Sequence, residues 1–251
     1  MAGLSLSIML IGLLAFVPAE AAECKVATIA GNPEWSPYTQ LGSDGQLGGA
    51  GIEIARAALA SLDIEVRTGE AEPWARALAS LEAGRTDLIV SAYWTQERVE
   101  RFLYTEPYAE DPIAVFMKAS APFPVTGIGD LGGHSGVVPF GSNFGDELTA
   151  FLRADPRVSF NTSKEGMFRQ LLTPRIDYAI LARHNGERIL KQLDLAGAIV
   201  EAPTPLAVNK VYMMMSRKSP CAPQLPALDA ALAALAADGT IRRLIAAAES
   251  S

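Results

Sequence analysis

Hydrophobic and polar positions alternate along the chain with two periods, one typical of β-strands and the other of α-helices. Residues 25–30 and 88–91 form short, mostly apolar runs, as expected of strands that are buried in a sheet. Between these runs, apolar residues recur three, four and three positions apart, at Ile52, Ala55, Leu59 and Leu62. This spacing predicts one buried face of a helix.

The rest of the first half of the chain continues the alternation. Further strands are predicted over residues 64–68 and 112–118, and further helices over residues 73–84 and 96–102. Pro73 and Gly84 are typical of the start and the end of a helix, and Thr95 is a suitable N-cap. Residues 31–51 are rich in glycine and are predicted to be irregular. Together these elements contain a strand–helix–strand–helix–strand unit.

A second strand–helix series follows residues 119–124, where small residues and prolines predict a crossing into a second lobe. Its predicted strands cover residues 137–140, 176–181, 198–200 and 210–216. Its predicted helices cover residues 143–152, 184–193, 224–237 and 240–248. Another helix begins at Thr162 and Glu165, which have the spacing of a capping box. The strand over residues 210–216 is long enough to return to the first lobe.

The chain begins with an apolar run from Leu4 to Val17, about half the length of a membrane span. Ala19 and Ala21 follow it and fit the small residues that a signal peptidase recognises. We therefore expect residues 1–21 to be a signal peptide and the product to be exported in soluble form. An N-terminal core helix is the alternative. No Lys or Arg precedes the apolar run, although signal peptides normally begin with one.

Composition and charge narrow the class of protein. The chain has 251 residues, of which 49% are hydrophobic, and this excludes a disordered protein. It carries 21 Lys and Arg against 28 Asp and Glu, a net charge of −7. No run of Lys and Arg exceeds two residues. Because nucleic-acid binding depends on clustered cations, we expect no nucleic-acid partner.

Two cysteines, Cys24 and Cys221, lie near the two ends of the expected mature chain. In an oxidising compartment an even number of cysteines favours a disulfide, which would enclose nearly the whole chain. Two free, buried thiols are the alternative. A disulfide requires the first strand and the segment around Cys221 to be neighbours.

Catalytic and cofactor motifs are scarce. The sequence has two histidines, His134 and His184, in different predicted elements, which leaves little for a histidine triad or a metal site. Residues 127–132 match G-x-G-x-x-G, but no predicted strand leads into them and no helix follows. We therefore expect no metal and no cofactor.

Polar and aromatic side chains gather where the strand at residues 88–91 leads into the next helix. Ser91, Tyr93 and Trp94 leave this strand, and Arg98 lies in the first turn of the helix. A guanidinium at that position can bind a carboxylate through two parallel hydrogen bonds. The alternative is a solvated arginine that pairs with a neighbouring acid such as Glu97.

A second such turn holds Ser142 and Asn143, which precede a predicted helix. Backbone N–H groups, a hydroxyl and an amide there can bind an anion, or they can simply cap the helix. Aromatic residues suited to enclosing an apolar or cationic group concentrate in the first half of the chain, at Trp35, Tyr38, Trp74, Tyr93 and Trp94. Trp74 is equally compatible with a place in the core.

The order of several segments resembles the bacterial extracellular solute-binding proteins of family 3, the polar amino-acid-binding receptors of ABC importers. The similar segments are GGAGIEIA at residues 48–55, PWAR at 73–76, LEAGRTDLI at 81–89, TQER at 95–98, EPY at 106–108, DLGG at 130–133, RIDYA at 175–179 and ADGT at 237–240. They cover essentially the whole expected mature chain.

The resemblance implies an α/β fold of the type II periplasmic-binding kind, in which two α/β lobes are joined by two crossing strands and enclose a ligand cleft. Residues 22–118 and 216–251 would form lobe 1, and residues 119–215 would form lobe 2. Cys24 and Cys221 would then share a lobe, which supports the disulfide. The resemblance also implies a periplasmic monomer that binds a small-molecule ligand and delivers it to an inner-membrane ABC permease.

The family's ligand contacts correspond to particular residues of this chain. Arg98 matches the arginine that binds the ligand α-carboxylate, helped by Ser91 and by the turn at Ser142 and Asn143. Trp35 and Tyr38 match the aromatic wall around the ligand side chain.

The chain departs from the family pattern at two places. Asp87 precedes Arg98 by eleven residues where the family commonly has twelve, and the bulky Tyr93 and Trp94 lie between them. The acidic residue that holds the ligand α-ammonium is replaced by Ala182, and Arg183 follows it. Our hypothesis is a small carboxylate-bearing solute, an amino acid or a derivative, bound by Arg98 and Arg183.

Two other functions are compatible with the same resemblance. A cyclohexadienyl-dehydratase-like enzyme on this fold would need an acid–base group in the cleft, for which His184, Glu187 and Glu34 are the candidates. A ligand sensor would report to a membrane kinase as a separate partner.

Overall fold

The computed structural model describes residues 24–42, 44–69 and 71–249. The predicted signal peptide, residues 1–21, lies outside these ranges. Within them, no helix has both the length and the hydrophobicity that crossing a bilayer would need.

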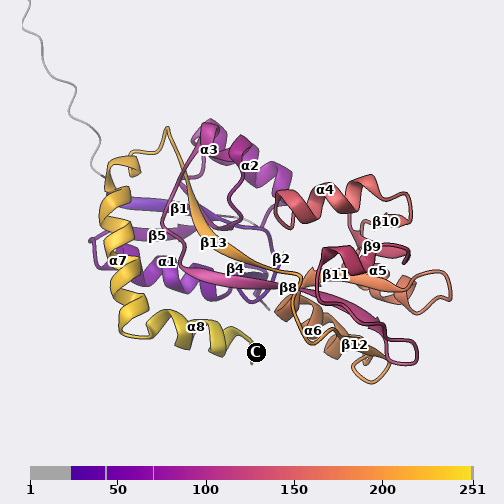
Figure 1. The fold of residues 1–251 in the computed structure, drawn as a ribbon. Helices are drawn as coiled ribbons and strands as arrows, with labels where there is room; N and C mark the ends of the chain where they lie inside the picture. Colours follow the sequence, from indigo (N-terminus) through magenta and orange to yellow (C-terminus); the bar gives the residue numbers. More distant parts are fainter. Residues whose placement is uncertain (1–23, 43, 70, 250–251) are drawn as a thin grey trace, which may run out of the picture.

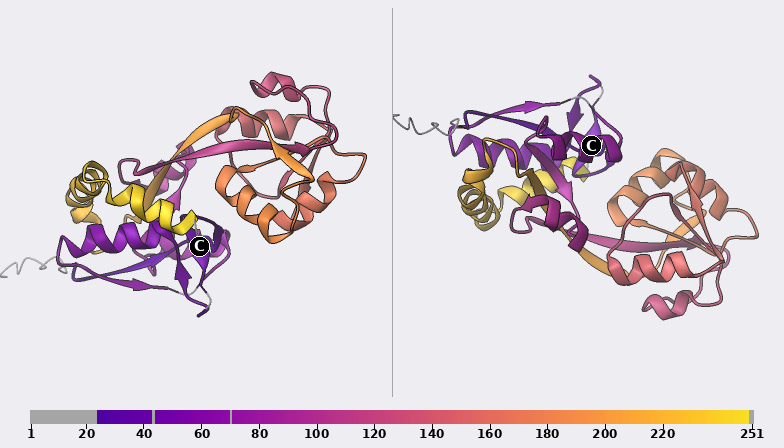
Figure 2. Two further views of the ribbon diagram at one scale, coloured as in Figure 1. Left: turned by 90° about the horizontal axis from the view of Figure 1, so that it is seen from below. Right: turned by 90° about the horizontal axis from the view of Figure 1, so that it is seen from above.

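In the described part of the chain, one ten-stranded sheet runs through both halves of the molecule. Its strand order is β10 (Val158–Asn161), β9 (Gly136–Pro139), β11 (Tyr178–Ala182), β8 (Ala109–Lys118), β13 (Ala207–Ser216), β6 (Leu88–Ala92), β1 (Val26–Ala30) and β5 (Glu65–Thr68). Two further strands lie off this path: β12 (Ile199–Glu201) pairs with β8, and β7 (Phe102–Tyr104) pairs with β13. Its two longest strands, β8 (Ala109–Lys118) and β13 (Ala207–Ser216), pair antiparallel over residues 109–113 and 207–211. Both strands then continue in opposite directions into the two lobes, which lie side by side (Figures 1 and 2).

The first lobe contains the strands β1 (Val26–Ala30), β5 (Glu65–Thr68), β6 (Leu88–Ala92) and β7 (Phe102–Tyr104). Its helices are α1 (Ala50–Ala60), α2 (Trp74–Ala83), α3 (Gln96–Arg101), α7 (Leu225–Ala237) and α8 (Thr240–Glu249). The 3₁₀ turn η2 (Ala222–Gln224) directly precedes α7. Alternate residues of β1 enter opposite cores: Ala27 and Ile29 pack with α1, α7 and α8, and Ala30 packs with α2. Both faces of the sheet are thus buried where β1 pairs in parallel with β5 and β6.

The second lobe contains β9 (Gly136–Pro139), β10 (Val158–Asn161), β11 (Tyr178–Ala182) and β12 (Ile199–Glu201). Its helices are α4 (Asp146–Ala154), α5 (Lys164–Leu171) and α6 (Arg183–Gln192), and the 3₁₀ turn η1 (Ile128–Leu131) precedes β9. Alternate residues of β8 again separate the two cores, with Val115 on the α4 side and Phe116 on the side of α5 and α6. Because β8 and β13 belong to both lobes, the exact residues at which the lobes divide stay a prediction.

The disulfide between Cys24 and Cys221 is confirmed, and it joins residues 197 positions apart whose Cα atoms lie 4.8 Å from each other. Cys24 precedes β1 and Cys221 precedes η2, so both lie in the first lobe. No free cysteine remains among the described residues.

Several local predictions need correction. Residues 31–51 are not wholly irregular, because β2 (Glu34–Trp35), β3 (Thr39–Leu41) and β4 (Leu47–Gly48) form a small antiparallel sheet there. The strands β7 and β10 were not predicted, and α4 begins at Asp146 rather than at residue 143. The N-cap of α5 is Ser163 rather than Thr162, since the Ser163 hydroxyl accepts the Gly166 N–H. Within the G-x-G-x-x-G match at residues 127–132, residues Ile128–Leu131 form the 3₁₀ turn η1.

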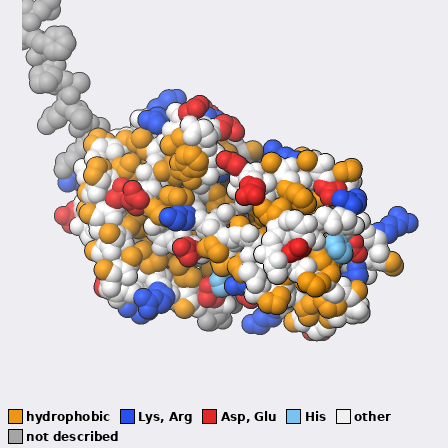
Figure 3. Space-filling model, viewed as in Figure 1, with side chains coloured by type: hydrophobic (Ala, Val, Ile, Leu, Met, Phe, Trp, Pro, Cys, Tyr) orange, Lys and Arg blue, Asp and Glu red, His pale blue; other side chains and the backbone are white. Residues whose placement is uncertain are grey.

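Charged side chains of both signs are interspersed over the face shown in Figure 3, on the first lobe as well as the second. The net charge of −7 is therefore not gathered into one patch on that face.

Candidate functional site

A cavity of about 220 Å³ lies between the lobes and is lined by residues from both. The lining follows the carboxyl ends of β1 and β6 in the first lobe and of β9 and β11 in the second. Ligands of open α/β sheets bind at this end of the strands. The described lining is Asn32, Glu34, Trp35, Trp74, Tyr93, Arg98, Pro139, Phe140, Gly141, Ser142, Asn143, Phe144, Thr162, Lys164, Leu181, Ala182 and Asn185.

The aromatic wall of the first lobe is held by a buried carboxylate. The rings of Trp35 and Tyr93 meet edge to face with centroids 4.6 Å apart. Trp35 Nε1 and Tyr93 OH both donate to Oδ2 of Asp111, at 2.9 Å and 2.5 Å. Burial raises the pKa of the Asp111 carboxyl, and these two hydrogen bonds oppose the rise. Burial and the nearby Asp111 charge likewise raise the pKa of Tyr93, so its hydroxyl stays a donor that fixes the ring.

Arg98 lines the cavity and is positioned by its neighbours. The predicted N-cap is present, because the Thr95 hydroxyl accepts the Arg98 N–H at 3.3 Å. The Arg98 guanidinium donates from Nη1 to the carbonyl of Tyr93 at 3.2 Å and lies 5.1 Å from the ring centroid of Trp74. Stacking on an aromatic face leaves the edge of a guanidinium for bidentate hydrogen bonds.

The neighbouring acid does not neutralise Arg98. Glu97 lies 3.3 Å from Arg101, which also pairs with Glu82 at 2.5 Å. Within residues 24–42, 44–69 and 71–249, no carboxylate lies at ion-pair distance from Arg98. Arg98 is therefore a cation at the cavity without an anionic partner in the described part of the chain.

Ser142 and Asn143 line the cavity from the second lobe, but their side chains also support the local fold. The Ser142 hydroxyl donates to the Pro139 carbonyl at 2.7 Å. Asn143 Oδ1 accepts the N–H of Gly145 at 2.9 Å, just before α4. The N-cap of α4 is Gly145, and no side chain caps this helix, so the capping interpretation of Ser142 and Asn143 is wrong.

Contacts across the cavity join the two lobes at Glu34. Lys164, the first residue of α5, lies with Nζ 3.6 Å from Oε2 of Glu34 and also donates to the Glu34 carbonyl. Asn185 Nδ2, from α6, donates to the same carbonyl at 2.9 Å. Burial lowers the pKa of Lys164, and the Glu34 charge opposes this shift.

Four predicted site residues lie outside the lining. Ser91 is buried, with its hydroxyl 3.2 Å from that of Thr39. Tyr38 is buried in the first lobe and donates to the Glu110 carbonyl at 2.8 Å. Trp94 is 43% exposed. Arg183 donates to Glu201 of β12 at 2.6 Å, which satisfies the charge that was expected to face the ligand.

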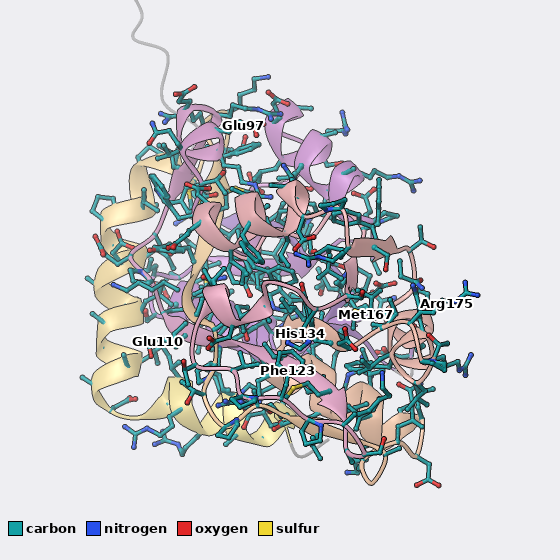
Figure 4. All side chains as sticks on the ribbon, turned by 45° about the vertical axis from the view of Figure 1, so that its right-hand side comes forward. Glu97, Glu110, Phe123, His134, Met167 and Arg175 are labelled. Atoms are coloured by element: carbon teal, nitrogen blue, oxygen red, sulfur yellow. A yellow bond between two sulfur atoms is a disulfide. The ribbon has the colours of Figure 1, made fainter. Side chains whose placement is uncertain are left out.

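Neither histidine lines the cavity. The ring of His134 stacks on Phe123 with centroids 3.7 Å apart, and its Nδ1 lies 3.8 Å from Asp177. Both His134 and Phe123 are labelled in Figure 4. His184 lies between Glu187, at 3.6 Å, and Glu249 of α8, at 3.1 Å. Of the proposed acid–base candidates, only Glu34 lines the described cavity. The described residues also contain no cluster of acidic, histidine and cysteine side chains that could hold a metal ion.

Comparison with protein families matches residues 27–247 to the bacterial extracellular solute-binding proteins, family 3. Among solved structures, a histidine kinase sensor domain similar to periplasmic binding proteins is 21% identical, with a TM-score of 0.73 over 88% of this chain and 95% of that chain. An amino acid ABC transporter substrate-binding protein, AbpA from Streptococcus pneumoniae, bound to L-arginine, is 20% identical, with a TM-score of 0.72 over 90% and 95%.

A third structure is an ancestral amino-acid-binding protein described as a precursor of cyclohexadienyl dehydratase. It is 17% identical, with a TM-score of 0.70 over 88% of this chain and 93% of that chain. At these identities the likeness shows a shared fold, which confirms the predicted type II periplasmic-binding architecture.

Proposed function

The chain belongs to the bacterial extracellular solute-binding proteins of family 3, and from this premise we propose that it is the periplasmic binding component of an ABC importer. It captures a small carboxylate-bearing solute, an amino acid or a derivative, between its lobes. The resemblance predicted from the order of sequence motifs is confirmed by the family match over residues 27–247.

The observation that carries this proposal is the unneutralised Arg98 at the cavity. The guanidinium is partly buried, stacks near Trp74, and has no carboxylate partner among the described residues. A partly desolvated guanidinium gains most from a bidentate carboxylate, because charge-assisted hydrogen bonds are about twice as strong as neutral ones. A ligand carboxylate supplies the anion that this position lacks.

The contacts at Glu34 allow ligand binding to favour the state in which the two lobes are in contact. Lys164 and Asn185 reach Glu34 from the second lobe, across the same cavity that Arg98 lines from the first. A ligand that contacts both sides favours the state in which the lobes meet, and it shifts the equilibrium by its differential affinity for that state. A permease that recognises this state would then receive loaded protein.

Isothermal titration calorimetry with a panel of amino acids and other small carboxylates tests the proposal. Once a ligand is found, Arg98→Ala is expected to weaken its binding by about a hundredfold or more, because the ligand carboxylate loses its charged partner. Arg101→Ala is the matched control, since Arg101 lies on the same helix but pairs with Glu82 and Glu97 on the surface. Equal effects of the two substitutions would remove Arg98 from the site.

Binding without turnover distinguishes this role from a dehydratase. The described lining holds one carboxyl, that of Glu34, whose side chain is 73% exposed and pairs with Lys164. A general acid needs a proton held close to the leaving group, and an exposed carboxylate that pairs with Lys164 does not provide it. Recovery of unchanged ligand after prolonged incubation is expected, and conversion of an arogenate-like substrate would instead favour the enzyme.

The compartment and the partner follow from the same proposal. A disulfide persists in an oxidising compartment such as the periplasm, where a signal peptide over residues 1–21 would deliver the protein. The similar kinase sensor domain shows that this fold also serves in sensing. Ligand-dependent stimulation of a reconstituted ABC permease would support a role in import. Stimulation of a membrane kinase would instead support a role in sensing.

A further inference from the structure

The charges that line the cavity do not match those of a zwitterion. The described lining contains two cations, Arg98 and Lys164, and one acid, Glu34. Glu34 Oε2 lies 3.6 Å from Lys164 Nζ, so these two charges offset each other. Arg98 is left as the unbalanced charge, and the described cavity is suited to a ligand that carries one negative charge and no positive charge.

An α-ammonium would meet an unfavourable environment here. Removing an ammonium from water is costly unless a carboxylate or several acceptors replace its hydration. Where the second lobe approaches the cavity at the end of β11, Leu181 and Ala182 present apolar groups. Glu34 Oε2 already faces Lys164, so a ligand ammonium would have to share with this lysine the one carboxylate of the described lining.

Asn185 provides a neutral acceptor at the same place. This residue lines the cavity and is only 2% exposed. Its Nδ2 donates to the Glu34 carbonyl, which fixes the orientation of the amide and makes the other atom, Oδ1, an acceptor. Among the described residues Oδ1 has no hydrogen-bond partner. A buried polar atom of this kind is normally satisfied, so the ligand is a natural source of the missing donor.

The rest of the lining favours an apolar ligand body. Five aromatic residues face the cavity: Trp35, Trp74, Tyr93, Phe140 and Phe144. Phe140 is 74% exposed, although it is a large apolar side chain in the turn after β9. A ligand with an apolar or aromatic side chain would cover this ring and contact the wall held by Asp111.

We infer that the preferred ligand is a monoanionic carboxylate whose α-substituent is a neutral hydrogen-bond donor rather than an ammonium, with an apolar or aromatic side chain. Its carboxylate binds Arg98 and its α-donor binds Asn185 Oδ1. A 2-hydroxy acid and an N-acylated amino acid both have this chemistry. The inference rests on the proposed function and deepens it.

Matched ligands test the inference by calorimetry on the full mature chain. L-Phenyllactate and N-acetyl-L-phenylalanine each supply a carboxylate and a neutral α-donor, whereas L-phenylalanine supplies an ammonium in its place. The same comparison is repeated with leucine-derived and tryptophan-derived ligands. At least one neutral-donor ligand is expected to bind at least about tenfold more tightly than the corresponding amino acid. Comparison of the hydroxy acid with the N-acetyl amino acid shows whether a hydroxyl or an amide is the preferred donor.

The outcomes separate this inference from the proposed function. An amino acid that binds as tightly as its neutral counterparts, or more tightly, overturns the inference but leaves a carboxylate-binding receptor. If no carboxylate in the panel binds, both the inference and the proposed function are wrong.

A substitution at Asn185 tests the assigned acceptor without depending on overall affinity. In the wild type, phenyllactate is expected to bind about tenfold more tightly than 3-phenylpropanoate, which lacks the α-donor. In Asn185→Ala this ratio is expected to fall to about one. Loss of the Glu34 contact affects both ligands equally and cancels in the ratio, and circular dichroism verifies the fold. An unchanged ratio would remove Asn185 from ligand recognition.

Discussion

Two aspartates, one in each lobe, make the same pair of backbone hydrogen bonds. Asp87 donates its N–H to the Thr28 carbonyl at 2.9 Å, and its Oδ2 accepts the Thr28 N–H at 2.8 Å. Asp177 exchanges the equivalent two bonds with Ser135, both at 2.8 Å. Each carboxylate therefore satisfies a backbone donor beside a parallel strand, which explains why Asp occurs in both motifs although neither residue lines the described cavity.

At the residue scale, Asp87→Ala is expected to lower the free energy of unfolding by about 2 kcal/mol, because it leaves the Thr28 N–H and the Ser219 hydroxyl without their acceptor. Asp177→Ala is expected to cost about 1 kcal/mol, since its carboxylate is 43% exposed and water can replace it. Urea unfolding of both variants measures the difference. A larger loss for Asp177→Ala would contradict this account, and Asp→Asn at each site keeps an acceptor as a control.

Individual residues of the site were harder to predict than their elements. The turns at residues 93–98 and 142–143 were predicted from polar side chains next to buried strands, and both line the cavity. Lys164 was not predicted, because a lysine in the first turn of a helix is normally solvated and only the three-dimensional fold brings Glu34 to it. Arg183 begins α6 and its partner Glu201 lies in β12, so their proximity is set by tertiary structure.

At the element scale, the approach of α6 to β8 depends on a glycine. A Cβ at Gly186 would lie 2.2 Å from Cζ of Phe116, a side chain only 1% exposed in the core of the second lobe. Helix α6 can therefore lie closely over β8 only because residue 186 has no side chain. The same helix carries Asn185 to the cavity.

Gly186→Ala is expected to lower the free energy of unfolding by about 2 kcal/mol, because overpacking at Phe116 exceeds the gain of about 1 kcal/mol from helix propensity. Ligand affinity is expected to fall as well, since α6 must shift together with Asn185. Gly197→Ala serves as the control, because no atom lies within 4 Å of its added Cβ. Equal thermal stability of the two variants would show that α6 and β8 can move apart to accommodate the added methyl group without loss of stability.

The elements that the sequence predicted best are those with a full period of apolar residues. Helices α1, α2, α5 and α8 agree with the apolar spacing to within a few residues, and so do β1, β6 and β11. By contrast, β2 and β4 contain two residues each and β7 contains three, which is too short for a period of two to be distinguished from a loop. Their pairing is a tertiary property.

At the scale of the whole molecule, the disulfide closes almost the entire described chain. On the loop-entropy model, a closure over 197 residues stabilises the folded state by about 5 kcal/mol. The double variant Cys24→Ser and Cys221→Ser is expected to unfold at a clearly lower denaturant concentration than the oxidised wild type. It should still bind ligand under native conditions, because both cysteines lie outside the described cavity lining.

Denaturant titration of the oxidised and reduced wild type, beside the double variant, provides the measurement. Reduction should affect the wild type and leave the double variant unchanged. An unfolding midpoint that does not respond to reduction would mean that the cross-link contributes nothing to stability.

The sheet order has a consequence for the sequence in which the protein can assemble as it is made. Strand β13 lies between β8 and β6, and α7 and α8 cover the core of the first lobe, so residues from 207 onward complete a lobe that began at residue 24. The second lobe lies almost wholly between residues 119 and 206 and can condense from local contacts. The N-terminal strands must therefore wait, without a finished core, until the last part of the chain has emerged. We therefore expect a chain that ends before residue 207 to lack a finished first lobe, although nearly all of its second lobe is present.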